Sequence, residues 1–240
     1  MKRAAALLAL VALGVAPGSA DAGPRRHRPV VVELFTAQGC VSCNKAIGPF
    51  ADLADSPGII AITLPVDYWD YLGWPDTFAM PEFADRQKDY ERHFGLRDVY
   101  TPQVVVDGAA QAPGDDGPAV KDLVAKAKYK FVHSPDLLFR RDGRVAIGSG
   151  LTVRGGADVW LIRFDPRTHA VEVKAGDNHG AVVAERNVVR QIVRLGVWTG
   201  RPGLFKMPAA DAEGLTNLIL VQEARGGKIL AARAQSTPQD

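Results

Sequence analysis

The stretch from Val30 to Cys43, VVVELFTAQGCVSC, constrains the fold more than any other part of this chain. Its first six residues, Val30–Phe35, are apolar and β-branched enough to form a buried strand. A short turn over 36–39 follows, and two cysteines then open an expected helix. Cys43 lies one helical turn after Cys40, within reach of a disulfide. The stretch predicts a strand, a turn and a helix that begins with a redox dithiol.

A helix start is a favourable place for a reactive thiol. Unpaired backbone N–H groups and the helix dipole favour negative charge there. Such a position can lower a thiol pKa from about 8.5 into the range ~3.5–7.5, which supplies thiolate near neutral pH. We therefore expect Cys40 to be the more reactive of the two cysteines.

The N-terminus has the order of a secretory signal peptide over residues 1–22. Lys2 and Arg3 precede an apolar run, Ala4–Val15, and small residues follow up to candidate cleavage points at Ala20 and Ala22. No later stretch has the ~20 apolar residues of a transmembrane helix. We expect an exported protein, periplasmic or secreted, without a transmembrane segment.

Export bears on the two cysteines of the chain, both of which lie in this one motif. Disulfides persist outside the cytoplasm, so a structural bridge is one interpretation. A ring of four residues, however, removes little chain entropy, about 1.9 kcal/mol against ~4.7 for a hundred-residue loop. Redox use is therefore the preferred interpretation.

A net charge of +2 gives no indication of nucleic-acid binding, and the cluster from Arg25 to Arg28 indicates a solvated tail.

Strand-like and helix-like segments alternate between residues 29 and 132. Pro49 predicts a kink or an early end of the Cys40 helix. The segments expected after this helix are a strand at Ile59–Val66, a loop that leads into a helix at Pro75–Phe94, a strand at Val99–Asp107 and a helix from Ala119 to about Phe131. This alternation predicts an α/β layer. Because parallel strands end at a common edge, the Cys40 turn and the aromatic segment Asp67–Trp74 are expected to share that edge.

The sequence changes character near residue 134 and predicts a smaller β-rich, sandwich-like unit over 134–235. Two hairpins are expected around Asp142-Gly143 and Gly226-Gly227. Short strands are expected at Asp158–Phe164 and Ala170–Val173, and Asn187–Leu195 fits either a helix or a strand. Asn178, His179, Arg190 and Arg194 are interpreted as loop and surface residues.

The stretch VVELFT, the pair Cys40-Val-Ser-Cys43 and the segment FGLRDVYTPQVVVDG together resemble the thioredoxin-like superfamily over residues 29–132. The resemblance implies a thioredoxin-like domain in which the Thr101-Pro102 bond is cis, lies beside the dithiol and helps bind the substrate backbone. Together with VDYWDYLGW and LGVWTG, these motifs are similar to a secreted bacterial thioredoxin-like family that is labelled only as a domain of unknown function. That likeness supplies no activity.

The function expected from this resemblance is thiol–disulfide exchange with protein thiols. Cys40 would attack, and Cys43 would resolve the mixed disulfide. Glu33 could relay a proton to Cys43 if it is buried, or could equally point to the sheet rim or pair with an arginine. Asp67 matches an acid near the thioredoxin site, and Tyr68 and Trp69 could form a wall of the binding groove or an aromatic plug.

Other classes of function remain open. Two thiolates with a histidine can bind copper or zinc, but the histidines are scattered and none has ligand spacing to the cysteines: His27, His93, His133, His169 and His179. A non-catalytic interaction protein on the same fold is a third class. We expect no cofactor and no metal, and as partners a protein thiol or disulfide substrate and a redox partner. Oxidation, reduction and isomerisation all remain open.

Overall fold

The computed structural model describes residues 28–128, 134–151 and 153–235. The expected signal peptide, the start of the Arg25–Arg28 cluster, His27, His133 and the expected helix end near Phe131 lie outside the described residues. No helix in the described ranges is long and apolar enough to cross a membrane.

Helices and strands alternate in the first half of the chain, as the sequence predicts. The elements are β1 (Val30–Thr36), the 3-10 turn η1 (Val41–Cys43), α1 (Asn44–Ala54), β2 (Ile59–Pro65), the 3-10 turn η2 (Asp70–Leu72), α2 (Pro81–Phe94), β3 (Gln103–Val106), β4 (Ala110–Pro113) and α3 (Gly117–Lys128). Gly95 ends α2 in the left-handed conformation, with φ +64°, which glycine adopts at little cost. Pro49 neither ends α1 nor shortens it, since the helix continues to Ala54.

The second half is built from strands. They are β5 (Leu137–Phe139), β6 (Arg144–Ile147), β7 (Ala157–Glu172), β8 (Val182–Trp198), β9 (Gly203–Lys206), β10 (Thr216–Glu223) and β11 (Ile229–Ala234). The two expected hairpins are confirmed as β5–β6 and β10–β11. The two short strands expected between 158 and 173 are wrong, because both belong to the single strand β7, whose pairing with β8 continues across irregularities on either side of Asp165. The ambiguous segment Asn187–Leu195 lies within β8.

The sheet order joins the two halves of the chain. Eight strands form one mixed sheet in the order β11-β10-β7-β8-β2-β1-β3-β4, and β5, β6 and β9 form a smaller sheet. β2 lies parallel to β1 on one side and to β8 on the other, where Thr63 pairs with Val188. The fold is therefore mixed α/β, as expected. The division into units 29–132 and 134–235 stays a prediction.

Alternation along β1 supplies the two faces of the central layer. Val30, Val32 and Leu34 pack with Phe50 of α1 and with apolar residues of α3, whereas Val31 and Phe35 pack with apolar residues of α2. Each fully buried side chain of this size stabilises the fold by about 1.5–3 kcal/mol. Because β1 is covered on both faces, the turn after its C-terminal end has a fixed position.

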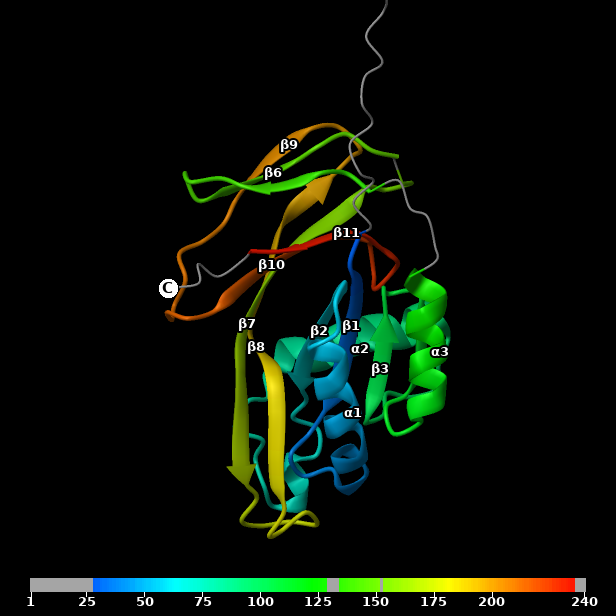
Figure 1. Ribbon diagram of the computed structural model, residues 1–240, viewed down its shortest axis with the longest axis vertical. Helices are drawn as coiled ribbons and strands as arrows, with labels where there is room; N and C mark the ends of the chain where they lie inside the picture. Colours follow the sequence, from blue (N-terminus) through cyan, green and yellow to red (C-terminus); the bar gives the residue numbers. More distant parts are fainter. Residues whose placement is uncertain (1–27, 129–133, 152, 236–240) are drawn as a thin grey trace, which may run out of the picture.

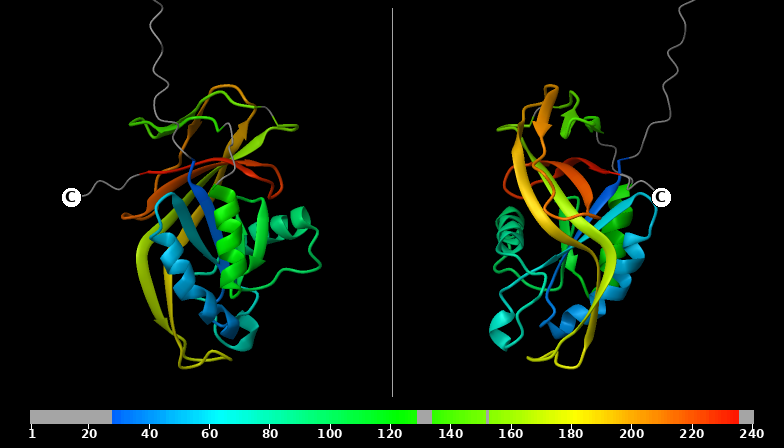
Figure 2. Two further views of the ribbon diagram at one scale, coloured as in Figure 1. Left: turned by 45° about the vertical axis from the view of Figure 1, so that its right-hand side comes forward. Right: turned by 90° about the vertical axis from the view of Figure 1, so that its left-hand side faces the viewer.

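The β7–β8 hairpin connects the two ends of the molecule. Figures 1 and 2 show it running along one side, from the small β5–β6–β9 sheet down to a tip near the start of α1. The tip, residues 173–181, closes with backbone hydrogen bonds from Val173 N–H to Ala181 O and from Gly180 N–H to Val173 O. The hairpin thereby carries residues from the second half of the chain to the turn that follows β1.

Candidate functional site: a disulfide at the end of a central strand

Cys40 and Cys43 form a disulfide directly after β1 and its turn. The Cys40 N–H donates to the Ala37 carbonyl at 3.1 Å, and the Cys43 N–H donates to the Cys40 carbonyl at 3.1 Å. Cys40 precedes η1, and α1 begins one residue after Cys43, so a 3-10 turn stands where the sequence predicts the first helical turn. Both cysteines are buried, with exposed fractions of 4% and 1%.

Three segments that are distant in sequence meet at Cys40. The Thr101-Pro102 bond is cis, as expected, and the Thr101 hydroxyl donates to Cys40 Sγ at 3.3 Å. Trp69 Nε1 donates in turn to Thr101 Oγ1 at 2.7 Å. A chain of hydrogen bonds therefore leads from the aromatic segment through Thr101 to the sulfur. The expected common edge of the Cys40 turn and the aromatic segment is confirmed.

The aromatic segment has an inner and an outer part. The Tyr68 hydroxyl donates to Gln87 of α2 at 3.1 Å, and burial raises the pKa of Tyr68 to about 12, so the hydroxyl stays protonated. Tyr71 stacks on Trp69 with ring centroids 6.4 Å apart and is 77% exposed. Trp74 Nε1 donates to Gln38 Oε1 at 3.0 Å. Tyr71 is thus the exposed part of the segment, whereas Trp69 and Trp74 are half-buried and hydrogen-bond to Thr101 and Gln38.

The tip of the β7–β8 hairpin contacts the dithiol turn. Asn178 Nδ2 donates to the Gln38 carbonyl at 2.8 Å, and Asn44 Nδ2 donates to Asn178 Oδ1 at 2.9 Å. The interpretation of Asn178 as a surface residue is therefore wrong, because the side chain is buried between the turn and the start of α1, whereas His179 and Arg194 are exposed. Arg190 is half-buried, with its guanidinium 4.0 Å from the centre of the Phe78 ring.

Gln38 also lies between two buried acids that the sequence analysis did not single out. Its N–H donates to Asp76 Oδ2 at 2.6 Å, and its side-chain Nε2 donates to Glu185 Oε2 at 3.4 Å. Burial and the neighbouring Asp76 carboxylate raise the pKa of Glu185 to about 8, and burial also raises the pKa of Asp76. Glu185 lies on β8, 147 residues from Gln38 in the sequence, so no local pattern could indicate the contact.

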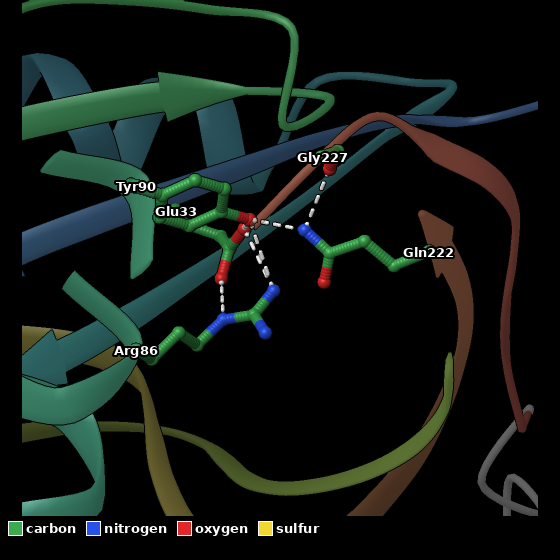
Figure 3. Close-up of polar contacts among 5 residues, drawn as sticks. All are labelled: Glu33, Arg86, Tyr90, Gln222 and Gly227. Atoms are coloured by element: carbon green, nitrogen blue, oxygen red, sulfur yellow. Dashed lines mark hydrogen bonds and ion pairs between the residues drawn. The ribbon is translucent and has the colours of Figure 1, made fainter. Parts of the chain in front are cut away.

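Glu33 belongs to a different cluster, with α2 and β10 (Figure 3). Arg86 Nε donates to Glu33 Oε1 at 2.6 Å and Arg86 Nη2 to Glu33 Oε2 at 3.1 Å, while the Tyr90 hydroxyl also donates to Oε2. Gln222 Nε2 donates both to the Tyr90 hydroxyl and to the Gly227 carbonyl. Of the alternatives weighed for Glu33, the pairing with an arginine is the one observed.

The remaining predicted residues lie outside the contacts at Cys40. The Asp67 carbonyl accepts the Asp70 N–H at the start of the turn that contains η2. Within the described residues, no three histidine, cysteine, aspartate or glutamate side chains are grouped so that they could hold a metal ion. His93 is exposed and packs on Phe94.

The family model described as "Protein of unknown function (DUF1223)" matches residues 31–222, which include the dithiol, the Thr101-Pro102 strand and the β7–β8 hairpin. The chain belongs to the DUF1223 family. No curated protein was found to match it.

Two solved structures resemble the chain. Protein AGR_C_4864 from Agrobacterium tumefaciens superimposes with a TM-score of 0.71 at 29% identity, over 88% of this chain and 96% of that one. HBP35 of Porphyromonas gingivalis superimposes with a TM-score of 0.56 at 12% identity, over 89% of this chain and 76% of that one. At 12% identity the second likeness shows the fold alone.

Proposed function

We propose that this DUF1223 protein is an exported thiol–disulfide oxidoreductase that acts on protein thiols, with a thioredoxin-like arrangement of its first half. The observation that carries the proposal is the Cys40–Cys43 disulfide at the end of β1 with Thr101-Pro102 against it, the Thr101 hydroxyl 3.3 Å from Cys40 Sγ. β1 lies between β2 and β3, and α1 begins just after the dithiol, which further supports a thioredoxin-like arrangement. The signal-peptide pattern at the N-terminus supports export.

A reducing partner opens the disulfide in two steps. A thiolate of the partner attacks Cys40 Sγ, the Cys40–Cys43 bond breaks, and Cys43 leaves as a thiolate that takes up a proton. A second thiolate of the partner then attacks the partner's sulfur in the mixed disulfide and releases Cys40 as a thiolate, which takes up a second proton. The partner loses two electrons and two protons, and the protein gains them. In the opposite direction, Cys40 attacks a substrate disulfide and Cys43 resolves the mixed disulfide.

Protein disulfide reduction tests this proposal. The signal-cleaved protein, kept reduced by dithiothreitol, is expected to accelerate the reduction of insulin, and Cys40→Ser is expected to abolish the acceleration. Cys43→Ser that has been reduced and then freed of dithiothreitol is expected to accumulate a mixed disulfide between Cys40 and an insulin chain, because no second thiol is present to resolve it. If the wild-type protein does not accelerate the reduction and Cys43→Ser traps nothing, the proposal is wrong.

The burial of the dithiol favours a second candidate function. With only 4% of Cys40 exposed, a partner must displace neighbouring side chains to reach the sulfur. A non-catalytic interaction protein would keep this disulfide closed permanently. The rate at which Cys40 of the reduced protein reacts with a small disulfide, such as oxidised glutathione, distinguishes the two functions. Only the oxidoreductase needs this reaction to be fast.

A further inference from the structure

Two buried acids from distant parts of the chain converge on the residue two positions before Cys40. Asp76 comes from the loop before α2, Glu185 comes from β8, and both hydrogen-bond to Gln38. Their exposed fractions are 8% for Asp76, 2% for Glu185 and 0% for Gln38. A buried carboxyl without a cation beside it is costly to ionise, so each such group in a fold requires an explanation.

Asp76 is firmly held. Its Oδ2 accepts the Gln38 N–H at 2.6 Å and its Oδ1 accepts the Phe78 N–H at 2.9 Å, while the Asp76 N–H donates to Asp70 Oδ1 at 2.9 Å. Hydrogen bonds from backbone N–H groups favour the ionised form of a carboxyl. Asp76 therefore has two donors that stabilise its negative charge.

Glu185 has much weaker support for a negative charge. Its Oε2 accepts only the long 3.4 Å contact from Gln38 Nε2, and its Oε1 is buried without a hydrogen-bond partner in the described part of the chain. Of the two acids, Glu185 has the weaker stabilisation of its charged form, and burial beside Asp76 raises its pKa to about 8. Burial raises the pKa of Asp76 as well, so each carboxyl affects the titration of the other.

Other charged and titratable groups lie around the pair. Arg190, on the same strand, opposes protonation of Glu185, and Asp70 adds negative charge beside Asp76. His169 is opposite Glu185 in the β7–β8 register, but its Nε2 faces Asp165 Oδ2 at 2.9 Å, and Arg167 pairs with the same carboxylate at 2.7 Å. Arg167 therefore pairs with Asp165 rather than with the two acids, and the charge of Arg190 is shared between Asp165 and Glu185.

We propose that Glu185 and Asp76 are positioning residues that couple the ionisation of a buried carboxyl to that of the Cys40 thiol through Gln38. As a device for disulfide exchange, this inference rests on the proposed function. The Gln38 N–H donates to Asp76 at 2.6 Å, and its side-chain Nε2 donates to Thr77 Oγ1 at 2.9 Å and makes the longer, 3.4 Å contact with Glu185. Gly39 is the only residue between Gln38 and Cys40. Ionisation of Glu185 would place a second negative charge at the base of the dithiol turn.

The sign of the coupling follows from like charges. A thiolate on Cys40 and a carboxylate on Glu185 repel each other, so each opposes the formation of the other. Two groups coupled in this way lose their protons over a wider pH interval than a single group does. A purely structural Glu185 would contribute shape and a hydrogen bond, which glutamine also supplies, and would not widen the titration of Cys40.

Alkylation of Cys40 against pH tests the coupling without requiring any redox partner. The full signal-cleaved protein is reduced, freed of reductant and treated with iodoacetamide at several pH values, and the Cys40 peptide is quantified by mass spectrometry. We expect the wild-type profile to be broader than a one-proton curve, with a second step near pH 8. Glu185→Gln should narrow the profile and shift its midpoint by roughly one pH unit to lower pH. The Cys43 thiol also lies beside Cys40 after reduction and is present in both proteins, so the difference between the two profiles reports Glu185.

Three further variants make the result specific. Glu185→Asp keeps an acid and should restore the broad profile. Asp76→Asn removes the neighbouring charge and should move the second step to lower pH. Glu172→Gln, an exposed glutamate of β7, is the matched control and should leave the profile broad. If Glu185→Gln does not fold, as judged by circular dichroism, the other two variants decide the question: Glu185→Asp should keep the wild-type profile, and Asp76→Asn should move its second step to lower pH.

The inference is overturned if the wild-type profile fits one proton, or if Glu185→Gln and the wild type superimpose. These outcomes are distinct from failure of the proposed function. Loss of insulin reduction with a broad Cys40 profile would refute the oxidoreductase and leave the coupling in place. Normal insulin reduction with superimposed profiles would refute only the coupling.

Discussion

Replacement of Arg86 by methionine should destabilise the fold strongly. Arg86 donates twice to Glu33, at 2.6 and 3.1 Å, and the two side chains are 7% and 0% exposed. The Glu33 carboxylate raises the pKa of Arg86 even though burial lowers it, so the arginine stays charged. Arg86→Met removes the cation and leaves Glu33 with the Tyr90 hydroxyl as its remaining observed donor. A buried charge that loses its partner in this way costs about 3–5 kcal/mol.

Urea unfolding and thermal melting measure this cost. At about 2–4 °C per kcal/mol for a domain of this size, Tm should fall by roughly 6–20 °C, and the urea midpoint should fall with an unchanged slope. Lys88→Met is the matched control on the same helix, because the Lys88–Asp85 pair is exposed and such pairs contribute about 0–1 kcal/mol.

A double-mutant cycle isolates the pair itself. Glu33→Gln combined with Arg86→Met removes both charges, so the double variant should be more stable than the sum of the single losses predicts, by about 1–3 kcal/mol. If Arg86→Met costs no more than Lys88→Met, or if the two single losses simply add, then the buried pair does not hold α2 against β1 in the way described.

Three other changes test separate parts of the structure. The pKa of Glu185 is raised from an ordinary 4.5 to about 8, so the folded state binds this proton more tightly than the unfolded state does. The free energy of unfolding should therefore fall by a few kcal/mol as pH rises from about 4.5 to 8. Glu185→Gln should remove most of that slope in urea titrations at several pH values. Gly108→Ala should destabilise the fold by well over the ~1 kcal/mol expected for Gly143→Ala in the same unfolding assay. Both glycines have positive φ, but a Cβ at Gly108 would lie 2.3 Å from the Gly227 carbonyl oxygen, whereas a Cβ at Gly143 would meet no atom within 4 Å. Equal losses of stability would contradict the close approach at Gly108. Trp69→Phe removes the 2.7 Å donor to Thr101 and should cost about 1 kcal/mol while changing the alkylation rate of reduced Cys40, whereas Trp160→Phe should leave that rate unchanged.

The sequence predicts the parts of the site that depend on local pattern. The run of β-branched residues before Cys40 indicates a strand, and a Cys-x-x-Cys pair after it indicates a thiol site at the strand end. The likeness of the segment around Thr101-Pro102 to thioredoxin-like proteins supplies the cis bond and its place beside Cys40. Each of these signals lies within about fifteen residues of chain.

The rest of the site depends on contacts between distant residues. Asn178 and Glu185 contact Gln38 across 140 and 147 residues, because the β7–β8 hairpin brings them there. The sequence does not reveal the length of this hairpin, since Asp165-Pro166 is typical of a turn yet lies within the β7–β8 pairing. Glu33 shows the same limit. Strand alternation places its side chain on one face of β1, but the choice among a relay, a rim position and an ion pair required the position of Arg86 on α2.

The reduction potential of the Cys40–Cys43 pair is the most direct test of the proposed oxidoreductase. The signal-cleaved protein is equilibrated in glutathione buffers, the fraction of disulfide is measured, and the metal content of the same sample is assayed. A disulfide that cycles with protein partners should have a potential between about −120 and −270 mV, and its position in that range indicates the direction of electron flow. A potential below about −300 mV would identify a permanently closed bridge and contradict the account.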